Sequence, residues 1–499
     1  MRVETPLPPK TQPPPPLGDE TVDLEALIKE ARERQRRRRR GLGLAVVALT
    51  AIGAVLGVVF GAGRGNPAVV RVPGGPTVDV AAFAGQGRLA FVSRNSLWVV
   101  DGTNRSLRKV EVPAGLRPLR PLFSPDGKWL AFLETTSVPS DVAGGALGYS
   151  QVWLARGDGS HPHPVAGLGN ALLVGWSPTS DVLAGIAGPV SQRVPYGVLT
   201  TLRLATPDRP TRVLVRSRYV RGAVWSPDGS QLAVVSENRR LVDTLATYSI
   251  SGAAPTLWAT LRPHDHLNGM GQPLIDPAGW WHGQGIGVWV YGNGMTRNLD
   301  ATPLDVISHP GAKPRFLADT LSVETTRIVS GLKRELAVVA DVSHGRNGGR
   351  VYWDAKQVQI CSAVGTCAPV AVSPSRSRVT LDPEWSPDGR KLAFIEAPDR
   401  LQGGWGQRTL TRWSSEHVLR VYDTKSHRLQ TIAAAKGAAI PLWSANGNSL
   451  LYVDSDGVSL LPTLHARPVR IATPLFAPSR WPSYYGQIAW SDQLSWWSK

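Results

Sequence analysis

The sequence predicts an all-β protein built from a repeated unit, and three observations carry this prediction. Glycine (51 residues) and proline (41) are frequent, which favours many turns. Tryptophan reaches 18 residues against only 8 phenylalanines, and large aromatic side chains favour short strands. A ten-residue phrase, FSPDGKWLAF at 123–132, returns as WSPDGSQLAV at 225–234 and as WSPDGRKLAF at 385–394.

The N-terminal part has a different composition. Residues 1–20 are rich in proline, cannot form a core, and predict a disordered cytoplasmic tail. Residues 21–40 favour a basic juxtamembrane helix. Residues 41–63 carry no charge and, at about 1.5 Å per helical residue, match the roughly 30 Å hydrocarbon core of a bilayer, so they predict a transmembrane helix. Residues 64–79 are then a linker, and residues 80–499 hold the repeats.

A block of arginines immediately precedes the predicted helix. Positive flanks of a membrane helix stay in the cytoplasm, so the prediction is a single-pass protein of the cell membrane, with a cytoplasmic N-terminus and extracytoplasmic repeats. A cleavable signal peptide and a buried soluble helix are the alternatives, but a 40-residue leader is long for a signal peptide. Nucleic-acid binding is the alternative role of the block, and its position favours the topogenic role. The block consists of Arg36, Arg37, Arg38, Arg39 and Arg40.

Each repeated phrase contains the elements of a tight turn. Proline presets φ, aspartate accepts local backbone hydrogen bonds, and glycine takes a positive φ, so the phrase predicts a link between two antiparallel strands. Catalysis or metal binding by the three aspartates is the alternative, but their recurrence favours turn chemistry. We therefore assign a structural role to Ser124, Pro125, Asp126 and Gly127, to Ser226, Pro227, Asp228 and Gly229, and to Ser386, Pro387, Asp388 and Gly389.

Degenerate copies of the phrase fill the gaps between the three close ones. WSPTSDVLAG at 176–185 and WSANGNSLLY at 443–452 are recognisable, and weaker copies begin at Phe83, Trp281 and Val329. A spacing near 50 residues predicts a solenoid, a propeller or an array, and four strand-like pieces per copy are typical of a propeller blade. Eight copies predict eight blades, with seven as the alternative. The apolar residues that align after the turns are Leu89, Leu130, Leu183, Leu232, Ile286, Leu336, Leu392 and Leu450.

The phrase resembles the WD40-like repeat of TolB-type β-propellers. The resemblance covers roughly residues 80–499 and implies a propeller fold, but it says little about function, because propellers host many unrelated activities. TolB is a soluble periplasmic protein, whereas this chain has a predicted anchor and more copies, so TolB's partners are not carried over. The final stretch QIAWSDQLSWWSK at 487–499 is one more partial copy. We expect it to pair with the first blade and close the ring, which removes an exposed sheet edge.

The remaining candidate residues give few indications of chemistry. Cys361 and Cys367 flank a short turn and predict a disulfide across a hairpin, with free thiols as the alternative. His264 and His266, with Asp276 and His282 nearby, are the best candidates for a metal site, but a polar loop is favoured. Neither a nucleophile elbow nor a phosphate-binding loop is found, so the sequence predicts no cofactor, no metal and no enzyme.

Seven tryptophans lie outside the expected turn positions. Packing between blades is the favoured role, and stacking on sugar rings is the alternative. They are Trp280, Trp281, Trp405, Trp413, Trp481, Trp496 and Trp497.

The formal net charge of +17 favours anionic partners. Residues 1–40 contribute ten basic and seven acidic side chains, so most of the positive charge belongs to the repeat region. The leading prediction is a membrane-anchored extracytoplasmic scaffold that binds a protein or an anionic envelope polymer, with basic side chains gathered on one face. The alternatives are an extracytoplasmic enzyme acting on glycans at the propeller channel, and the sensor part of a transmembrane signalling system.

Overall fold

The computed structural model describes the chain from Val69 to Ser498, with gaps. The chain divides into two compact parts, Met1–Gly65 and Asn66–Lys499, and every described residue belongs to the second part. Below, a unit is one group of about four consecutive strands. The described ranges are 69–135, 150–188, 200–237, 242–261, 273–281, 283–292, 302–320, 329–330, 335–341, 356–362, 365–370, 378–398, 413–454, 457–475 and 493–498.

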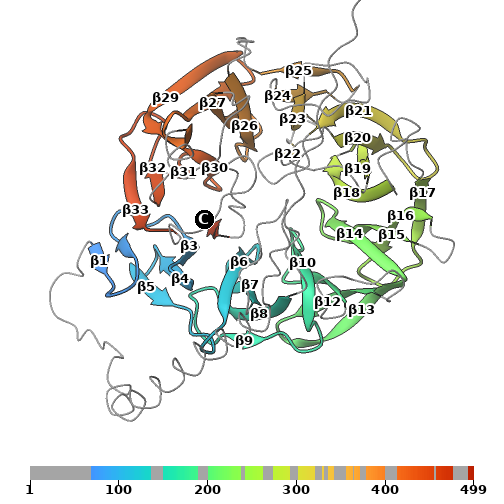
Figure 1. Ribbon diagram of the computed structural model, residues 1–499, viewed down its shortest axis with the longest axis horizontal. Coiled ribbons are helices and arrows are strands. Elements are labelled where there is room, and N and C mark those ends of the chain that lie inside the picture. The colour runs from blue at the N-terminus through green and yellow to red at the C-terminus, as the bar shows by residue number, and fades with distance from the viewer. Residues whose placement is uncertain are drawn as a thin grey trace, which may run out of the picture. The chain divides into compact units, whose positions relative to one another are not determined.

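The described strands form antiparallel sheets that follow one another around a ring (Figure 1). One sheet has the order β34–β3–β4–β5, with β34 at Leu494–Trp497, β3 at Arg88–Ser93, β4 at Ser96–Asp101 and β5 at Ser106–Lys109. The next has the order β13–β12–β11–β10–β8–β7–β6, with β9 paired to β8. Its strands are β6 (Arg117–Phe123), β7 (Trp129–Thr135), β8 (Ser150–Arg156), β9 (His163–Pro164), β10 (Asn170–Trp176), β11 (Leu183–Ala187), β12 (Thr200–Thr206) and β13 (Arg209–Ser217).

The rest of the ring repeats this pattern. A four-stranded sheet holds β14 (Tyr219–Trp225), β15 (Gln231–Glu237), β16 (Asp243–Ser249) and β17 (Thr256–Leu261). A larger sheet holds β18 (Pro273–Trp281), β19 (Gly285–Gly292), β20 (Thr302–Ile307), β21 (Arg315–Thr320), β22 (Val329–Ser330), β23 (Leu336–Asp341), β24 (Lys356–Cys361) and β25 (Cys367–Pro369). Another holds β26 (Arg378–Trp385), β27 (Lys391–Pro398), β28 (Val418–Asp423) and β29 (Arg428–Lys436).

The last sheet in the ring contains strands from both ends of the described chain. Its order is β1–β2–β33–β32–β31–β30, and β2 pairs with β33 through Thr77 and Thr473. The predicted linker 64–79 therefore contains two strands that extend this sheet. The strands are β1 (Val69–Arg71), β2 (Thr77–Asp79), β30 (Ala439–Trp443), β31 (Leu450–Val453), β32 (Val458–Leu461) and β33 (Val469–Thr473).

The three close copies of the repeated phrase form the predicted turns. In each, the aromatic residue ends one strand and lies opposite the leucine that follows the turn: Phe123 faces Leu130, Trp225 faces Leu232, and Trp385 faces Leu392. The turns define one end of the strands, which we call the hinge face. The connections from the second to the third strand of each unit leave from the other end, the opposite face.

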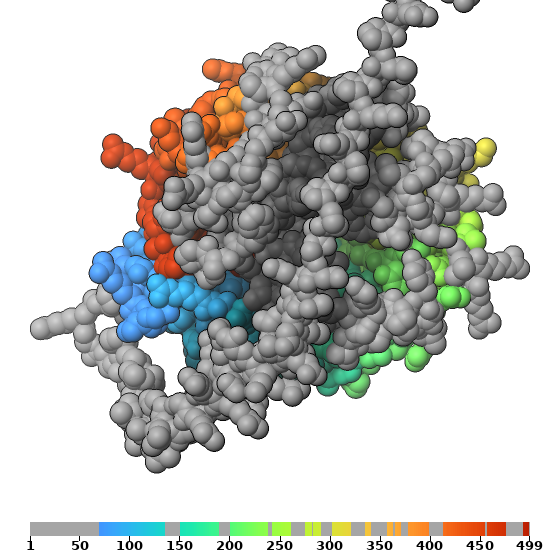
Figure 2. Space-filling view, viewed as in Figure 1, coloured from blue at the N-terminus to red at the C-terminus, as the bar shows by residue number. Residues whose placement is uncertain are grey.

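The core consists of buried apolar clusters between successive four-stranded units. Leu130 and Phe132 of β7, for example, are fully buried against Ala90 and Val99 of β3 and β4. Burying such a side chain stabilises the fold by about 1.5–3 kcal/mol. A further cluster joins residues of β3 and β4 to residues of β31 and β32, so the two ends of the ring share a core. Figure 2 shows the blue and red parts of the chain side by side.

The C-terminal strand completes the sheet that contains β3. Leu494 is buried and lies opposite Phe91, and Trp497 lies opposite Arg88. The prediction that residues 487–499 pair with the first repeat and close the ring is confirmed for Leu494–Trp497.

The predicted membrane location is corrected by the structure. Among the described residues, no helix is long and apolar enough to cross a bilayer; the helical turn at 413–415 is far shorter than the roughly 20 residues that a span requires. The predicted single-pass location in the cell membrane with a cytoplasmic N-terminus is therefore not supported by the described part of the chain. The predicted span 41–63 and the arginine block Arg36–Arg40 lie outside the described residues.

Candidate functional site

The aspartates of the repeated turns are fully engaged in holding the turn. Asp126 Oδ1 accepts hydrogen bonds from the Ser124 hydroxyl at 2.7 Å and from the backbone N–H of Lys128 at 2.9 Å. Burial opposes ionisation of Asp126, but the hydrogen bonds from Lys128 and Ser124 outweigh it and lower the pKa to about 2. Asp228 and Asp388 accept equivalent bonds. These contacts match the structural role assigned to the turn residues.

Tryptophans at the ends of inner strands connect successive units. Trp176 Nε1 donates to the Leu122 carbonyl at 2.9 Å, and Trp225 Nε1 donates to the Gly175 carbonyl at 3.0 Å. Trp443 Nε1 makes the same contact to Glu384, one unit back along the ring. We call the aromatic residue that ends the first strand of a unit its hinge aromatic. In each case the acceptor is the residue just before the hinge aromatic of the preceding unit. The indole N–H therefore serves as a bond between blades.

Two of the tryptophans expected to lie outside the turn positions occupy them. Trp280 lies opposite Ile286 and donates to the Val224 carbonyl at 3.2 Å, so it, and not Trp281, is the hinge aromatic of that copy. Trp496 lies opposite Leu89 and donates to the Gln86 carbonyl at 2.7 Å. Their roles are therefore in packing and ring closure. Trp405 and Trp481 lie outside the described residues.

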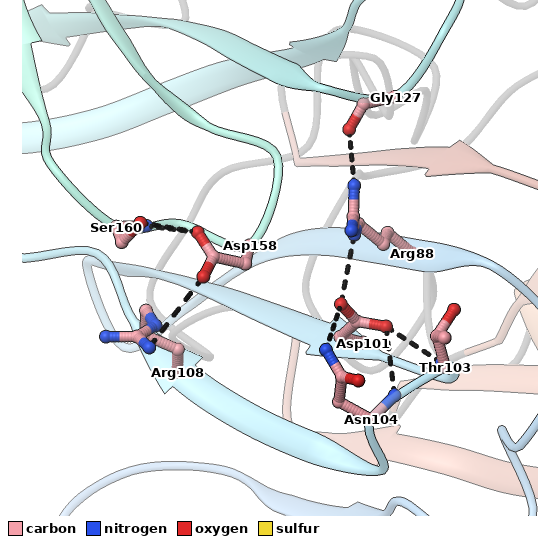
Figure 3. A network of polar contacts seen from close by, with 8 residues as sticks. All are labelled: Arg88, Asp101, Thr103, Asn104, Arg108, Gly127, Asp158 and Ser160. Atoms are coloured by element: carbon pink, nitrogen blue, oxygen red, sulfur yellow. Dashed lines mark hydrogen bonds and ion pairs between the residues drawn. The ribbon is translucent and has the colours of Figure 1, made fainter.

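A polar network on the hinge face links the first two units (Figure 3). Arg88 Nε contacts Asp101 Oδ2 at 3.1 Å, and Arg88 Nη1 donates to the Gly127 carbonyl at 2.6 Å. Asp101 Oδ1 also accepts the backbone N–H of Thr103 at 2.8 Å. Trp497 Nε1 donates to the Pro125 carbonyl at 2.9 Å, and the Arg88 guanidinium lies 5.5 Å from the Trp497 ring centre. The network therefore fastens the C-terminal strand to the next repeated turn.

This network predicts a position-specific effect of adding a methyl group. Gly127 has φ of +68°, and a Cβ there would lie 2.3 Å from the Trp497 ring, whereas Gly252 has φ of +90° with open space around it. We expect Gly252→Ala to cost about 1–2 kcal/mol from backbone strain alone. Gly127→Ala should cost clearly more, because it also displaces Trp497. Urea denaturation of both variants measures the difference, and equal losses would contradict the role of Trp497.

The two cysteines form the predicted disulfide. Cys361 and Cys367 are bonded, with their Cα atoms 3.9 Å apart, at facing positions of β24 and β25. The bond crosses a hairpin turn on the hinge face, where Ser362 N donates to the Thr366 carbonyl at 2.9 Å. The disulfide therefore fixes the outer hairpin of one unit and leaves no free thiol among the described residues.

The opposite face carries carboxylates that arginines neutralise. Glu237 Oε2 accepts from Arg221 Nη2 at 3.2 Å, and Arg221 Nε donates to Asp243 at 2.6 Å. Further round the ring, Glu396 is bound by Arg378 and by Arg420. Burial opposes ionisation of Glu396, but the two arginines outweigh it and lower its pKa. These ion pairs stabilise the ends of the strands.

A basic stretch lies on the outer strand β13, which we call the arginine edge: Arg209, Arg212 and Arg216. All three side chains are exposed, β13 holds no acidic residue, and it forms an edge of its sheet. Figure 1 shows β13 at the outer rim of the ring. The Arg212 side chain donates to the Ile250 carbonyl, while no described group binds the side chains of Arg209 and Arg216. Overall charge does not indicate this edge, although RPTRVLVRS at 209–217 carries the signal.

The predicted gathering of basic residues around a loop face stays a prediction, and the outer strand β13 is a second candidate interface. The candidate metal ligands His264, His266 and His282 lie outside the described residues, and Asp276 lies in β18. Within the described ranges, no group of three or more metal-binding side chains comes together.

The sheets, the shared cores and the joined ends define a β-propeller protein. No family model matches the chain, and no curated protein does. Among solved structures, it is similar to the β-propeller domain of the Trilobed protease from Pyrococcus furiosus, at 10% identity and a TM-score of 0.39, covering 70% of this chain and 95% of that one. It is also similar to TolB from Acinetobacter baumannii, at 14% identity and a TM-score of 0.30, covering 69% of this chain and 63% of that one. Oligogalacturonate lyase in complex with manganese matches at 11% identity and a TM-score of 0.37, covering 78% and 85%.

The prediction that the protein is not an enzyme is not supported by the comparisons. Three structures of similar fold carry the names of enzymes: the oligogalacturonate lyase, a prolyl endopeptidase and an acylaminoacyl peptidase from Pyrococcus horikoshii. A propeller supports catalysis as readily as binding, because function depends on the residues placed on it. The absence of a familiar catalytic motif in the sequence was therefore no ground for excluding an enzyme.

Proposed function

We propose that this protein is a propeller scaffold that binds an acidic protein segment along the arginine edge. The observation that carries the proposal is an edge strand with three exposed arginines and no acidic residue. An edge strand presents N–H and C=O groups that no neighbouring strand has paired, and an extended peptide can add to it as a further strand.

The charge on β13 selects the partner. Like charges repel, so the arginines discourage pairing with a second copy of β13 and with other basic strands, which protects the edge from aggregation. An acidic strand is attracted instead. Val213, 36% exposed between the arginines, adds apolar contact area. The edge therefore favours a segment that alternates acidic and apolar residues.

We further propose that the ring has eight blades and that its repeat belongs to the TolB type. The support for eight is that the residues aligned after the turns, from Leu89 to Leu450, lie in eight different strands. Eight buried clusters also join successive units. The support for the repeat type is the Ser-Pro-Asp-Gly turn, whose side-chain bonds recur in three copies.

Charge reversal on β13 tests the binding proposal. The probe is a fluorescent peptide of alternating glutamate and valine, titrated at low and high salt. We expect R209E/R216E to weaken binding about tenfold, since two attractions are lost and two repulsions gained at a few tenths of a kcal/mol each. Added salt should weaken binding to the unmodified protein as well.

The matched control is R428E/K436E on β29, another outer edge strand with exposed basic residues. It changes the net charge by the same amount and should leave binding nearly unchanged. Equal losses in both variants would show that only total charge matters. Binding of dextran sulfate with the same dependence on Arg209 and Arg216 would replace the acidic peptide with an anionic polymer.

A further inference from the structure

Glu134, near the end of β7, is a buried carboxyl group without a partner. The residue is 3% exposed, and neither carboxyl oxygen has a hydrogen-bond donor within reach in the described part of the chain. Buried polar groups in folded proteins are nearly always paired, because an unpaired one loses its hydration without compensation. A hydrogen-bond donor from a bound molecule would therefore be stabilised at this position.

The same strand position elsewhere in the ring is neutralised. Glu396 follows Leu392 by four residues, as Glu134 follows Leu130, and both lie near the end of the second strand of their unit. Glu396 is held by Arg378 and, at 2.8 Å, by Arg420. Glu134 is thus the member of this pair that lacks its cations.

Strand register explains the difference. Glu396 lies opposite Thr380 and Val418, and the two arginines stand two residues from these partners. Glu134 lies opposite Pro118 and Gln151. The positions that correspond to the two arginines are occupied by Leu116 and Trp153. Apolar side chains have replaced both cations while the carboxyl group has stayed.

The surroundings of Glu134 suit a cation with an apolar stem. Alternate residues of a strand share a face, so Glu134 follows Leu130 and Phe132 on the side of β7 that packs against β3 and β4. Trp153 stacks on Phe132 with ring centres 6.2 Å apart. Aromatic rings attract cations, and alkyl stems pack on apolar walls. The Gln151 amide does not meet the carboxyl group, because it donates to the Val152 carbonyl at 3.2 Å.

A second unpaired acceptor belongs to the same wall. Gln493 is buried and its Oε1 has no donor in the described structure, while its backbone carbonyl accepts Val92 N at 2.7 Å. Val92 is part of the cluster that contains Phe132 and Trp153. The two unpaired acceptors favour a ligand with several donors, and the carboxyl group of Glu134 favours a cation. Trp153 Nε1, in the same wall, is itself a donor without a partner in the described structure.

We infer that Glu134 is the anionic acceptor of a binding subsite for an alkylguanidinium or alkylammonium group, at the end of β7 on the opposite face. The subsite is separate from the arginine edge and takes a ligand of opposite charge. An arginine or lysine side chain of a bound partner has this chemistry. With this ligand, Glu134 would make the kind of ion pair that Glu396 makes with arginines of the same chain.

The test uses the full chain labelled with 5-fluorotryptophan, and n-butylguanidinium as the probe. The ¹⁹F signal of Trp153, assigned with Trp153→Phe, should shift and saturate with n-butylguanidinium, whereas n-butanol, which has the same stem without charge, should not shift it. Glu134→Gln should weaken binding at least about tenfold, because it removes the charged acceptor. Glu111→Gln is the matched control, since Glu111 is 77% exposed and should leave binding unchanged.

Three outcomes would overturn the inference: no shift of the Trp153 signal, equal shifts with n-butanol, or unchanged binding by Glu134→Gln. If Glu134→Gln does not fold, the comparison of n-butylguanidinium with n-butanol on the unmodified chain still decides. Loss of the acidic peptide in R209E/R216E together with retained n-butylguanidinium binding would separate this subsite from the arginine edge.

Discussion

Deleting residues 494–499 should destabilise the propeller by about 5 kcal/mol or more. The deletion removes buried Leu494 and the partly buried Trp496 and Trp497, and burial of such side chains contributes about 1.5–3 kcal/mol each. It also removes the backbone hydrogen bonds between β34 and β3, at about 1 kcal/mol each. Because whole domains are stable by only about 5–15 kcal/mol, a large fraction of the truncated protein should be unfolded or opened at the ring joint.

Chemical denaturation and limited proteolysis measure this effect. The truncated chain should also aggregate, since loss of β34 leaves β3 as an exposed edge strand. Deleting Lys499 alone is the control and should leave the midpoint unchanged. A synthetic peptide of residues 487–499 should restore part of the lost stability when added in excess. An unchanged midpoint after removal of 494–499 would show that the ring does not depend on its C-terminal strand.

The turns and the ring were predictable because their information is local. Ser124, Asp126 and Gly127 stand within four positions of one another, and each has a backbone preference or a short-range bond that the sequence displays. The C-terminal closure was also predictable, because LSWW repeats the aromatic end of an inner strand. Adjacent tryptophans made the register ambiguous at Trp280 and Trp281, where the bond to Val224 decides.

The candidate sites depended on pairing that the sequence does not display. The arginine edge is an edge only because β13 pairs with β12 and with no other described strand. Residues 64–79 resemble a linker in sequence because β33, the strand through which β2 and β1 join their sheet, is almost 400 positions away. Nothing in the stretch WLAFLE distinguishes Glu134 from the ordinary polar end of a strand. Its lack of a cation follows from the identities of Leu116 and Trp153, which are neighbours only once the strands are in register.

The stability of the protein should fall between pH 4.5 and 7 through Glu134. Burial raises the pKa of Glu134 from 4.5 to about 7. Below pH 4.5 the carboxyl group is protonated in both the folded and the unfolded chain. The folded chain then does not have to bury a charge, and this contribution to stability is fully present. As the pH rises the unfolded chain ionises first, and this stability is lost up to the folded pKa, by about 3 kcal/mol.

Glu134→Gln isolates this contribution, since glutamine keeps the shape without titrating. The variant and the unmodified protein should differ little near pH 4, and the variant should become the more stable of the two as the pH rises to 7. The comparison is needed because His417 acts in the other direction: burial lowers its pKa to about 4, so its contribution is lost as the pH falls from 6.5. Saturating n-butylguanidinium should flatten the difference, because a bound cation favours the ionised carboxylate. Parallel pH profiles of the two proteins would mean that Glu134 finds a donor in the folded chain, and the cationic subsite would lose its basis.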